Sequence, residues 1–230
     1  MKYPSPLISG TIIKRYKRFL ADIILEDGRE ITAYVPNTGS MLSCWEKGNP
    51  VKLSHHTSSK RKYAYTLELI YNSQTWININ TSLSSLIVHE MLLQRILPSL
   101  PYYDEILLEQ TYQDSRFDFL LKHSRNQYFL EVKSVTFAQD KKALFPDAVS
   151  LRARKHLKTL IELKEKGNHS ILLFLVQRND VHSFSPAQKI DPIYAKDLAK
   201  AISIGVQVLA IQVLVSPEGI SMQREIPIHL

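Results

Sequence analysis

The chain has 230 residues, of which 44% are hydrophobic, and a formal net charge of +7, so it can form one large or two small globular domains. Its single cysteine, Cys44, excludes a disulfide framework and a thiolate zinc site. Residues 1–6 lack the apolar core of a signal peptide, and the longest strongly apolar run, 171–176, is too short to span a bilayer. We therefore expect a cytoplasmic protein without a membrane partner.

The positive charge is unevenly distributed along the chain. Residues 1–80 carry 11 Lys/Arg and 6 Asp/Glu (+5), whereas residues 81–230 carry 18 and 16 (+2). A basic N-terminal third favours a polyanionic partner, with nucleic acid as the first candidate. The alternative is a surface that is charged only for solubility.

Short β-like runs separated by turn residues fill the first 80 residues, and no amphipathic helix interrupts them. An Asp27-Gly28 pair marks one of the turns. The expected strands are residues 7–13, 19–25, 31–35, 51–54, 63–70 and 76–79. Such a series predicts a small barrel, and the five-stranded oligonucleotide-binding (OB) barrel is the first candidate.

Two clusters that combine cations and aromatic rings lie in this region. Cations track phosphates while aromatic faces stack bases, which is how such barrels hold single strands. The candidate nucleic-acid contacts are Lys14, Arg15, Tyr16, Lys17, Arg18, Lys60, Arg61 and Lys62. The alternative is a pair of charged loops with core aromatics. The polar loop 36–40 is either an anion-binding nest or a simple turn.

From residue 81 the pattern changes to helices and apolar strands. A helix begins at Thr81 or Ser82 and runs to about Leu97, because Pro98 stops it. Glu90 lies on its apolar stripe, and a buried carboxylate needs a partner. Glu90 is therefore either a ligand of a shared cation or a residue at the edge of the stripe.

The remaining elements alternate between strands and helices. Strands are expected at 105–112, 116–122, 128–137, 171–176 and 206–215, with helices at 151–166 and 192–204. This order predicts a mixed sheet with right-handed crossovers and flanking helices. The whole chain is then an α/β protein (α+β overall) with a barrel in residues 1–80 and a second domain in residues 81–230.

The most informative segment is the hairpin formed by residues 116–122 and 128–137. If its turn is centred between Ser124 and Arg125, Asp118 lies opposite Glu131, with Cβ atoms roughly 4.5–5.5 Å apart. Lys133 shares their face because strand side chains alternate. A slip of one residue would break this arrangement. A Glu-x-Lys pair alone is common on solvated strands, so the prediction depends on the register.

Two adjacent carboxylates repel each other unless a cation lies between them. Asp118, Glu131, the Val132 carbonyl and Glu90 offer the oxygen ligands that Mg²⁺ (or Mn²⁺) prefers, and Lys133 is placed to assist hydrolysis. Further candidate phosphate contacts surround this set. They are Arg116, Arg152, Lys155 and His156. Solubility is the alternative for the basic helix start, and His156 is either a partner of the carboxylates or a surface histidine.

One helix, three strands, a helix and a strand, with Asp on the second strand and Glu-x-Lys on the third, resembles the PD-(D/E)xK nuclease core. A second resemblance rests on seven spaced blocks, residues 14–22, 36–41, 60–63, 115–121, 131–136, 145–149 and 155–157. Through these blocks the chain is similar to the sugar fermentation stimulation protein A family along nearly its full length. The resemblance implies an N-terminal OB-fold-like barrel, a C-terminal restriction-endonuclease-like domain and DNA binding.

The chain departs from the usual pattern of that family at a few positions. Leu67 stands where a Trp is common, Val35 replaces a Cys, and Ser84 and Ser85 occupy a stretch that often includes Asn. None of these positions belongs to the acidic set. The departures bear on the details of nucleic-acid contact and leave the predicted metal ligands intact.

Three functions compete on this evidence. The first is a metal-dependent nuclease acting on DNA, either single-stranded or branched. The second is a non-catalytic DNA-binding regulator of sugar (maltose) metabolism genes. The third is a zinc hydrolase suggested by His89-Glu90, and it is discarded because no second His follows at helical spacing. The sequence leaves the strand form and the oligomeric state open.

Overall fold

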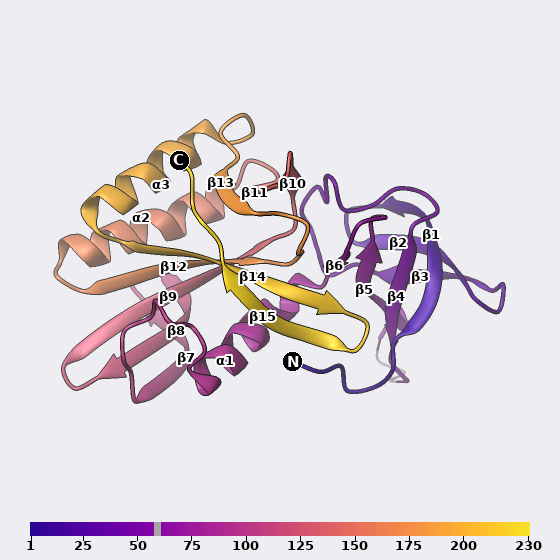
Figure 1. Cartoon of the computed structure of the whole chain (residues 1–230), viewed down its shortest axis with the longest axis horizontal. Coiled ribbons are helices and arrows are strands. Elements are labelled where there is room, and N and C mark those ends of the chain that lie inside the picture. Colours follow the sequence, from indigo (N-terminus) through magenta and orange to yellow (C-terminus); the bar gives the residue numbers. More distant parts are fainter. Residues whose placement is uncertain (58–60) are drawn as a thin grey trace.

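The computed structural model describes residues 1–57 and 61–230 of the chain. Figure 1 shows the first 80 residues, indigo to purple, as a barrel on the right, and the remainder as a sheet with helices on the left. Within the described residues, no helix combines the length and apolar character that crossing a membrane requires. Lys60, a predicted nucleic-acid contact, lies outside the described part of the chain.

The strands of the N-terminal part close on themselves. They are β1 (Ile8–Tyr16), β2 (Leu20–Leu25), β3 (Glu30–Tyr34), β4 (Pro50–His55), β5 (Tyr65–Tyr71) and β6 (Trp76–Asn78). β3 pairs antiparallel with β2 and parallel with β5, while β1 pairs with β2 and β4. This closure confirms the predicted OB-like barrel.

Turn residues and alternating apolar residues account for the barrel. Lys17 and Arg18 both have positive φ (49° and 64°) at the β1–β2 turn, and Gly28 (φ 84°) forms the predicted turn before β3. Alternate strand residues such as Ile12 and Ile23 point inward and are fully buried. Burying a side chain of this size stabilises the fold by roughly 1.5–3 kcal/mol.

A mixed sheet forms the centre of the C-terminal part. Its strands are β7 (Glu105–Tyr112), β8 (Ser115–His123), β9 (Asn126–Val135), β12 (His169–Val176), β14 (Gln207–Ser216) and β15 (Gly219–Glu225). Their order is β15-β14-β12-β9-β8-β7, and β12 runs parallel to both β9 and β14. β12 is almost completely buried, as its continuous apolar sequence predicted.

Helices cover both faces of this sheet. Figure 1 shows α2 (Leu151–Glu165) and α3 (Pro192–Ile204) on one side and α1 (Ser84–Gln94) on the other. Ser150 caps α2 by accepting a hydrogen bond from the Ala153 N–H at 3.1 Å. Asp191 caps α3 in the same way, and Pro192 and Gly205 mark its ends as predicted.

Some predicted boundaries and elements require correction. Residues 81–83 form a short 3₁₀ helix, η1 (Thr81–Leu83), and α1 ends at Gln94 because Arg95 adopts a left-handed conformation (φ 53°). The predicted end at Leu97 is therefore wrong. A small sheet of β10 (Ala138–Gln139), β11 (Lys142–Phe145) and β13 (Ser183–Pro186) was not expected, nor was β15.

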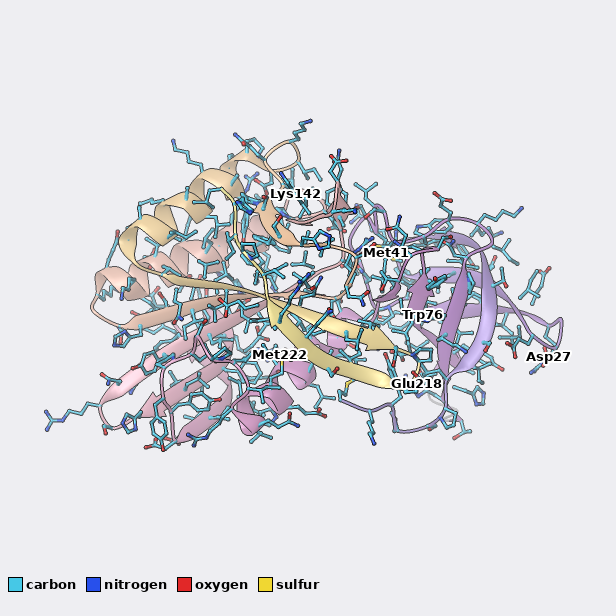
Figure 2. All side chains as sticks on the ribbon, viewed as in Figure 1. Asp27, Met41, Trp76, Lys142, Glu218 and Met222 are labelled. Atoms are coloured by element: carbon cyan, nitrogen blue, oxygen red, sulfur yellow. The ribbon has the colours of Figure 1, made fainter. Side chains whose placement is uncertain are left out.

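Polar contacts join the barrel to the second part of the chain. Asn78 donates hydrogen bonds from its backbone N–H and its side-chain amide to Gln177, both at 3.0 Å. Arg178, 3% exposed, donates to Ser43 in the barrel and to Thr136 after β9. Figure 2 shows Met41 in this region between the two parts, far from Asp27 at the outer tip of the barrel.

Candidate functional site

The hairpin of β8 and β9 has the register predicted from the sequence. His123 pairs with Asn126, and Phe119 pairs with Leu130. The backbone pairing of these two strands ends at Phe119, so the preceding residue, Asp118, lies where the strands diverge. The divergence leaves room for a side chain between the strands at this point.

Asp118 makes its contacts at this divergence. Its Oδ2 accepts a hydrogen bond from the Val132 backbone N–H, and its Oδ1 accepts one from the Ser85 hydroxyl of α1, both at 2.8 Å. Burial, and then the negative charge of Glu131, raise the pKa of Asp118 above its ordinary value. The carboxylate is therefore fixed in position beside a second negative charge.

Glu131 is 3% exposed and has two close partners on one oxygen only. Its Oε1 accepts from Lys133 Nζ at 2.5 Å and lies 2.5 Å from His156 Nδ1. Burial alone raises the pKa of Glu131, but the hydrogen bonds and charges of His156 and Lys133 outweigh it and lower the pKa. The other oxygen, Oε2, is buried without a hydrogen-bond partner among the described residues.

His156 lies in the interior and not on the surface. Its side chain is 8% exposed, and its ring packs at 6.3 Å from the ring of Phe117. The structure thus gives His156 a contact with Glu131 instead of exposure to solvent, which differs from the predicted phosphate contact. The alternative that the sequence left open, a partner of the carboxylates, is the arrangement found.

Glu90 lies away from this pair. Its Oε2 is 2.6 Å from the N-terminal amino group of Met1, and its side chain is 37% exposed. It is five residues beyond Ser85 on α1, which places it about 140° around the helix from the hydroxyl that contacts Asp118. The structure therefore separates Glu90 from the other predicted ligands and pairs it with a different cation.

Few side chains at this place could serve as metal ligands. Within residues 1–57 and 61–230, no three His, Cys, Asp or Glu side chains gather closely enough to hold a metal ion by themselves. Mg²⁺ is usually held by one or two carboxylates together with waters and substrate phosphates. The orphaned Glu131 Oε2 beside Asp118 suits that kind of binding, and the Val132 carbonyl stays a prediction.

Arg15 is committed to the chain's own backbone. Its guanidinium donates to the Arg18 carbonyl at 2.6 Å and to carbonyls of the loop 36–40 at 2.8–3.3 Å. These backbone carbonyls occupy guanidinium N–H groups of Arg15 that a phosphate would otherwise accept from. The structure thus gives Arg15 a role in holding the loop, which differs from the predicted phosphate contact.

The other residues of the first basic cluster are arranged around the β1–β2 turn. Lys14 lies 3.2 Å from Asp22, and the Tyr16 hydroxyl donates to the same carboxylate at 2.9 Å. Lys17 and Arg18 are exposed at the tip of the turn. These two residues are the members of the cluster that are best placed to meet a phosphate.

The second cluster is partly described. Arg61 and Lys62 are exposed, and Lys62 Nζ lies 5.7 Å from the centre of the Tyr63 ring. Both cations precede β5 at one end of the barrel. Their predicted contact with nucleic acid is compatible with this exposure and stays a prediction.

The predicted cations near the carboxylate pair differ in their surroundings. Arg116 is 65% exposed, with its guanidinium 3.6 Å from Glu109, and Lys155 Nζ lies 2.7 Å from Asp114. Arg152 is exposed at the start of α2. Surface ion pairs of this kind contribute little to stability, so both paired cations can exchange partners readily.

The loop 36–40 holds an anion that belongs to the chain itself. The Ser40 hydroxyl and the Met41 N–H donate to the Asp147 carboxylate at 3.1 and 3.2 Å. A Cβ at Gly39 would clash with that carboxylate, so a larger residue there would displace the Asp147 side chain. Of the two alternatives open from the sequence, the nest is the better description, although its anion is Asp147 and no ligand.

Sequence reasoning missed two residues of this region. Ser85 was noted only as a departure from a family pattern, and its contact with Asp118 depends on the packing of α1 against the sheet. Asp147 was recognised within a similar block but given no role. No local spacing connects either residue to its partner, because each contact spans 33 residues or more.

Family models match both parts of the chain. A model described as the SfsA N-terminal OB domain matches residues 13–79, and one described as the sugar fermentation stimulation protein RE domain matches residues 82–219. The chain is 44% identical to a sugar fermentation stimulation protein homolog of Geobacter sp. (strain M21), covering 100% of both chains. The homolog of Citrifermentans bemidjiense is 43% identical over the same share.

A solved structure is similar over the full length. It is described as the structure of Pyrococcus furiosus SfsA in complex with Ca²⁺. The TM-score is 0.90 at 26% sequence identity, and the match covers 100% of this chain and 98% of the other. The arrangement of barrel, mixed sheet and helices is therefore shared with that protein.

Proposed function

Because the chain belongs to the sugar fermentation stimulation protein family, we propose that it binds DNA and hydrolyses phosphodiester bonds with Mg²⁺ or Mn²⁺. The observation that carries the proposal is the buried Glu131 Oε2, which lies beside the carboxylate of Asp118 and lacks a hydrogen-bond partner in the part of the chain that the structure describes. An unsatisfied buried oxygen is costly, and a bound cation would satisfy it and relieve the repulsion between the two carboxylates.

The donor chemistry fits a hard divalent cation. Asp118 and Glu131 supply carboxylate oxygens, which Mg²⁺ and Ca²⁺ both prefer. The Pyrococcus furiosus relative is described as a Ca²⁺ complex, so a protein with this fold binds a hard divalent cation. That description does not name the ligands, and the assignment of the cation to Asp118 and Glu131 is our proposal.

Lys133 and His156 would have different roles in hydrolysis. A bound divalent cation would acidify water and polarise a phosphoryl oxygen. Lys133 would neutralise the charge that develops on the phosphate when a water oxygen bonds to phosphorus and the opposite P–O bond breaks. His156 would orient the Glu131 carboxylate, which it contacts at 2.5 Å.

The barrel would supply most of the DNA affinity. Lys17 and Arg18 at the β1–β2 turn and Arg61 and Lys62 before β5 are exposed cations on a part of the chain with a net charge of +5. Neutralising phosphates releases counterions, so the affinity should fall steeply with salt. Single-stranded or branched DNA suits a barrel of this class better than uniform duplex.

The test is cleavage of labelled single-stranded, duplex and branched DNA with Mg²⁺, Mn²⁺ or EDTA. Glu131→Gln should abolish a cleavage that requires metal, since the amide cannot replace the second carboxylate charge. Glu105→Gln is the matched control, because Glu105 is a half-exposed strand residue that contacts Lys122 at 3.5 Å. Cleavage in EDTA, or equal cleavage by wild type and Glu131→Gln, would contradict the proposal.

A second candidate is a non-catalytic DNA-binding regulator of sugar metabolism genes. One observation favours it: the ammonium of Lys133 lies 2.5 Å from Glu131 and compensates part of the negative charge of the pair without a metal ion. Binding without cleavage on every substrate, unaffected by Glu131→Gln, would support this alternative. DNA affinity that rises with Mg²⁺ only when Glu131 is intact would argue against it.

A further inference from the structure

A cavity of about 490 Å³ lies between the barrel and the start of α1. Residues 1–7 form one wall, the ends of β3, β4 and β5 form another, and Ser82, Leu83 and Leu86 complete it. Neither Asp118 nor Glu131 lines it. The volume lies within the range of about 300–1,000 Å³ found for ligand pockets.

The cavity wall contains buried polar groups. Glu68 is 5% exposed, and its two carboxylate oxygens accept from Ser54 at 2.6 Å and Asn80 at 2.8 Å. Each oxygen retains a further lone pair, since a carboxylate accepts about four hydrogen bonds. The hydroxyl of Tyr3 is also buried here, and it has no hydrogen-bond partner among the described residues. An acceptor and a free donor therefore line the same cavity.

Apolar and aromatic surfaces line the rest of it. Tyr34 is 40% exposed and Leu86 is 47% exposed, so both side chains are accessible at the cavity. The exposed cation Arg61 also lines it. Flat aromatic faces, buried hydrogen-bonding groups and a cation are the features with which proteins hold unstacked bases.

The cavity is next to the carboxylate pair along α1. Leu86 lines the cavity, and the preceding residue, Ser85, donates to Asp118 at 2.8 Å. Successive side chains on an α-helix point about 100° apart, so the cavity and the carboxylate pair lie at neighbouring faces of the first turn of α1. A strand whose phosphate lies at Asp118 would pass over this turn to place a base in the cavity.

We propose that this cavity receives one unstacked base of the strand that the carboxylate pair acts on. This inference rests on the proposed function. An N–H of the base donates to Glu68, a ring nitrogen or carbonyl accepts from the Tyr3 hydroxyl, and Tyr34 and Leu86 cover the base. The cavity would then set the position of the strand relative to the scissile phosphate.

The test measures binding of short single strands to the full chain in EDTA, by fluorescence anisotropy, so that no cleavage occurs. Each nucleotide is replaced in turn by an abasic one. One abasic position should weaken wild-type binding by about 5- to 150-fold, the range measured for single base–aromatic contacts. Tyr34→Ala should weaken binding of the intact strand by a similar factor, and Tyr3→Phe by a smaller one.

The decisive result is the combination of the two changes. In Tyr34→Ala the sensitive abasic position should cause a smaller further loss than in wild type, because the contact with Tyr34 is already absent and only the contacts with Glu68, Tyr3 and Leu86 remain to be lost. Tyr102→Ala is the matched control, since Tyr102 is 62% exposed and does not line this cavity. It should bind as wild type does and keep the full abasic penalty. Thermal unfolding of each variant shows whether it is folded.

The outcomes separate the inference from the proposed function. In one outcome, wild type binds the strand while the loss caused by the abasic position and the loss caused by Tyr34→Ala simply add in the combined experiment. That result would overturn the inference and leave the proposed function intact. No strand binding by wild type would overturn the inference, and metal-dependent cleavage of duplex or branched DNA would still decide the proposed function. A free mononucleotide offers the same chemistry, so deoxyadenosine and deoxycytidine monophosphates are tested as competitors. If either binds as tightly as the strand and Tyr34→Ala abolishes this, the ligand is a free nucleotide and the strand assignment is overturned.

Discussion

Two regions differ in how completely their charged side chains are hydrogen-bonded: the contacts between the barrel and the second domain, around Arg178 and Asp180, and the carboxylate pair of Asp118 and Glu131. At the contacts, Asp180 accepts two hydrogen bonds from Arg178 at 2.6 Å and one from Asn72 at 3.3 Å. At the carboxylate pair, Glu131 Oε2 accepts no hydrogen bond from residues 1–57 or 61–230. Both regions are mostly buried, and both bring together residues that lie far apart in the sequence.

This difference separates charges that hold the fold from a charge that is available for a ligand. A buried charge with all its partners resists removal but offers nothing to bind. A buried charge with an open oxygen weakens the fold and is retained where it serves a site. Changes at the contacts should therefore affect stability, and changes at the pair should affect activity.

Arg178→Met should have the largest effect on stability. It leaves Asp180 without its cation and removes the donor to the Thr136 carbonyl, and breaking a buried pair costs about 3–5 kcal/mol. The free energy of unfolding in urea measures this loss. Arg116→Met is the control, because Arg116 is 65% exposed and its change should leave unfolding nearly unaltered. If Arg178→Met and Arg116→Met lowered the free energy of unfolding equally, the contacts around Arg178 would not be the ones that hold the fold.

Lys133→Met tests the other region. Removing one group that stabilises transition-state charge typically lowers kcat by about 10²–10³-fold. We expect that loss in metal-dependent cleavage, with DNA affinity unchanged because the affinity resides in the barrel. Lys122→Met on the neighbouring strand, where Lys122 contacts Glu105 at the surface, should retain full activity. A loss of affinity that matches the loss of rate would show that Lys133 binds the strand and does not act in hydrolysis.

The fold and the register of the site were predictable because they depend on local patterns. Alternating apolar residues and turn residues gave the strands of the barrel, and the polar turn at 124–125 fixed the β8–β9 pairing. The end of α1 was misplaced because Arg95 adopts a left-handed conformation that no local residue signalled. β13 and β15 are hard to recognise because β13 has only four residues and β15 ends in three polar residues, 223–225.

The partners of the charged residues were not predictable, because they come from distant parts of the chain. Arg15 stood in a basic run that favoured phosphate binding, yet the carbonyls it contacts belong to the loop 36–40. The sequence leaves two alternatives open for His156, and the contact between α2 and β9 decides between them. A sequence shows which charges exist, whereas only packing shows which of them are already used.

Arg15 and Lys17 provide a smaller test within one hairpin. Arg15→Met removes several hydrogen bonds to backbone carbonyls and should cost about 1–3 kcal/mol in unfolding free energy, with little change in DNA affinity. Lys17→Met should leave stability unchanged, weaken DNA binding and reduce the slope of log affinity against log salt by about 1. If Arg15→Met flattens the salt slope as well, Arg15 contacts phosphate in addition to the loop.

The smallest effect concerns the pH dependence of the contact at Asp180. Burial alone raises the pKa of Asp180, but the hydrogen bonds and charge of Arg178, together with Asn72, outweigh it and lower the pKa. A carboxylate with a lowered folded pKa adds stability above its unfolded pKa of about 3.9, and this stability is lost as the pH falls through the folded value. The stability difference between wild type and Asp180→Asn should therefore be constant near neutral pH and shrink below about pH 4. Urea unfolding across this range measures it, and a difference that grows as the pH falls would show that Asp180 does not carry its charge in the folded protein.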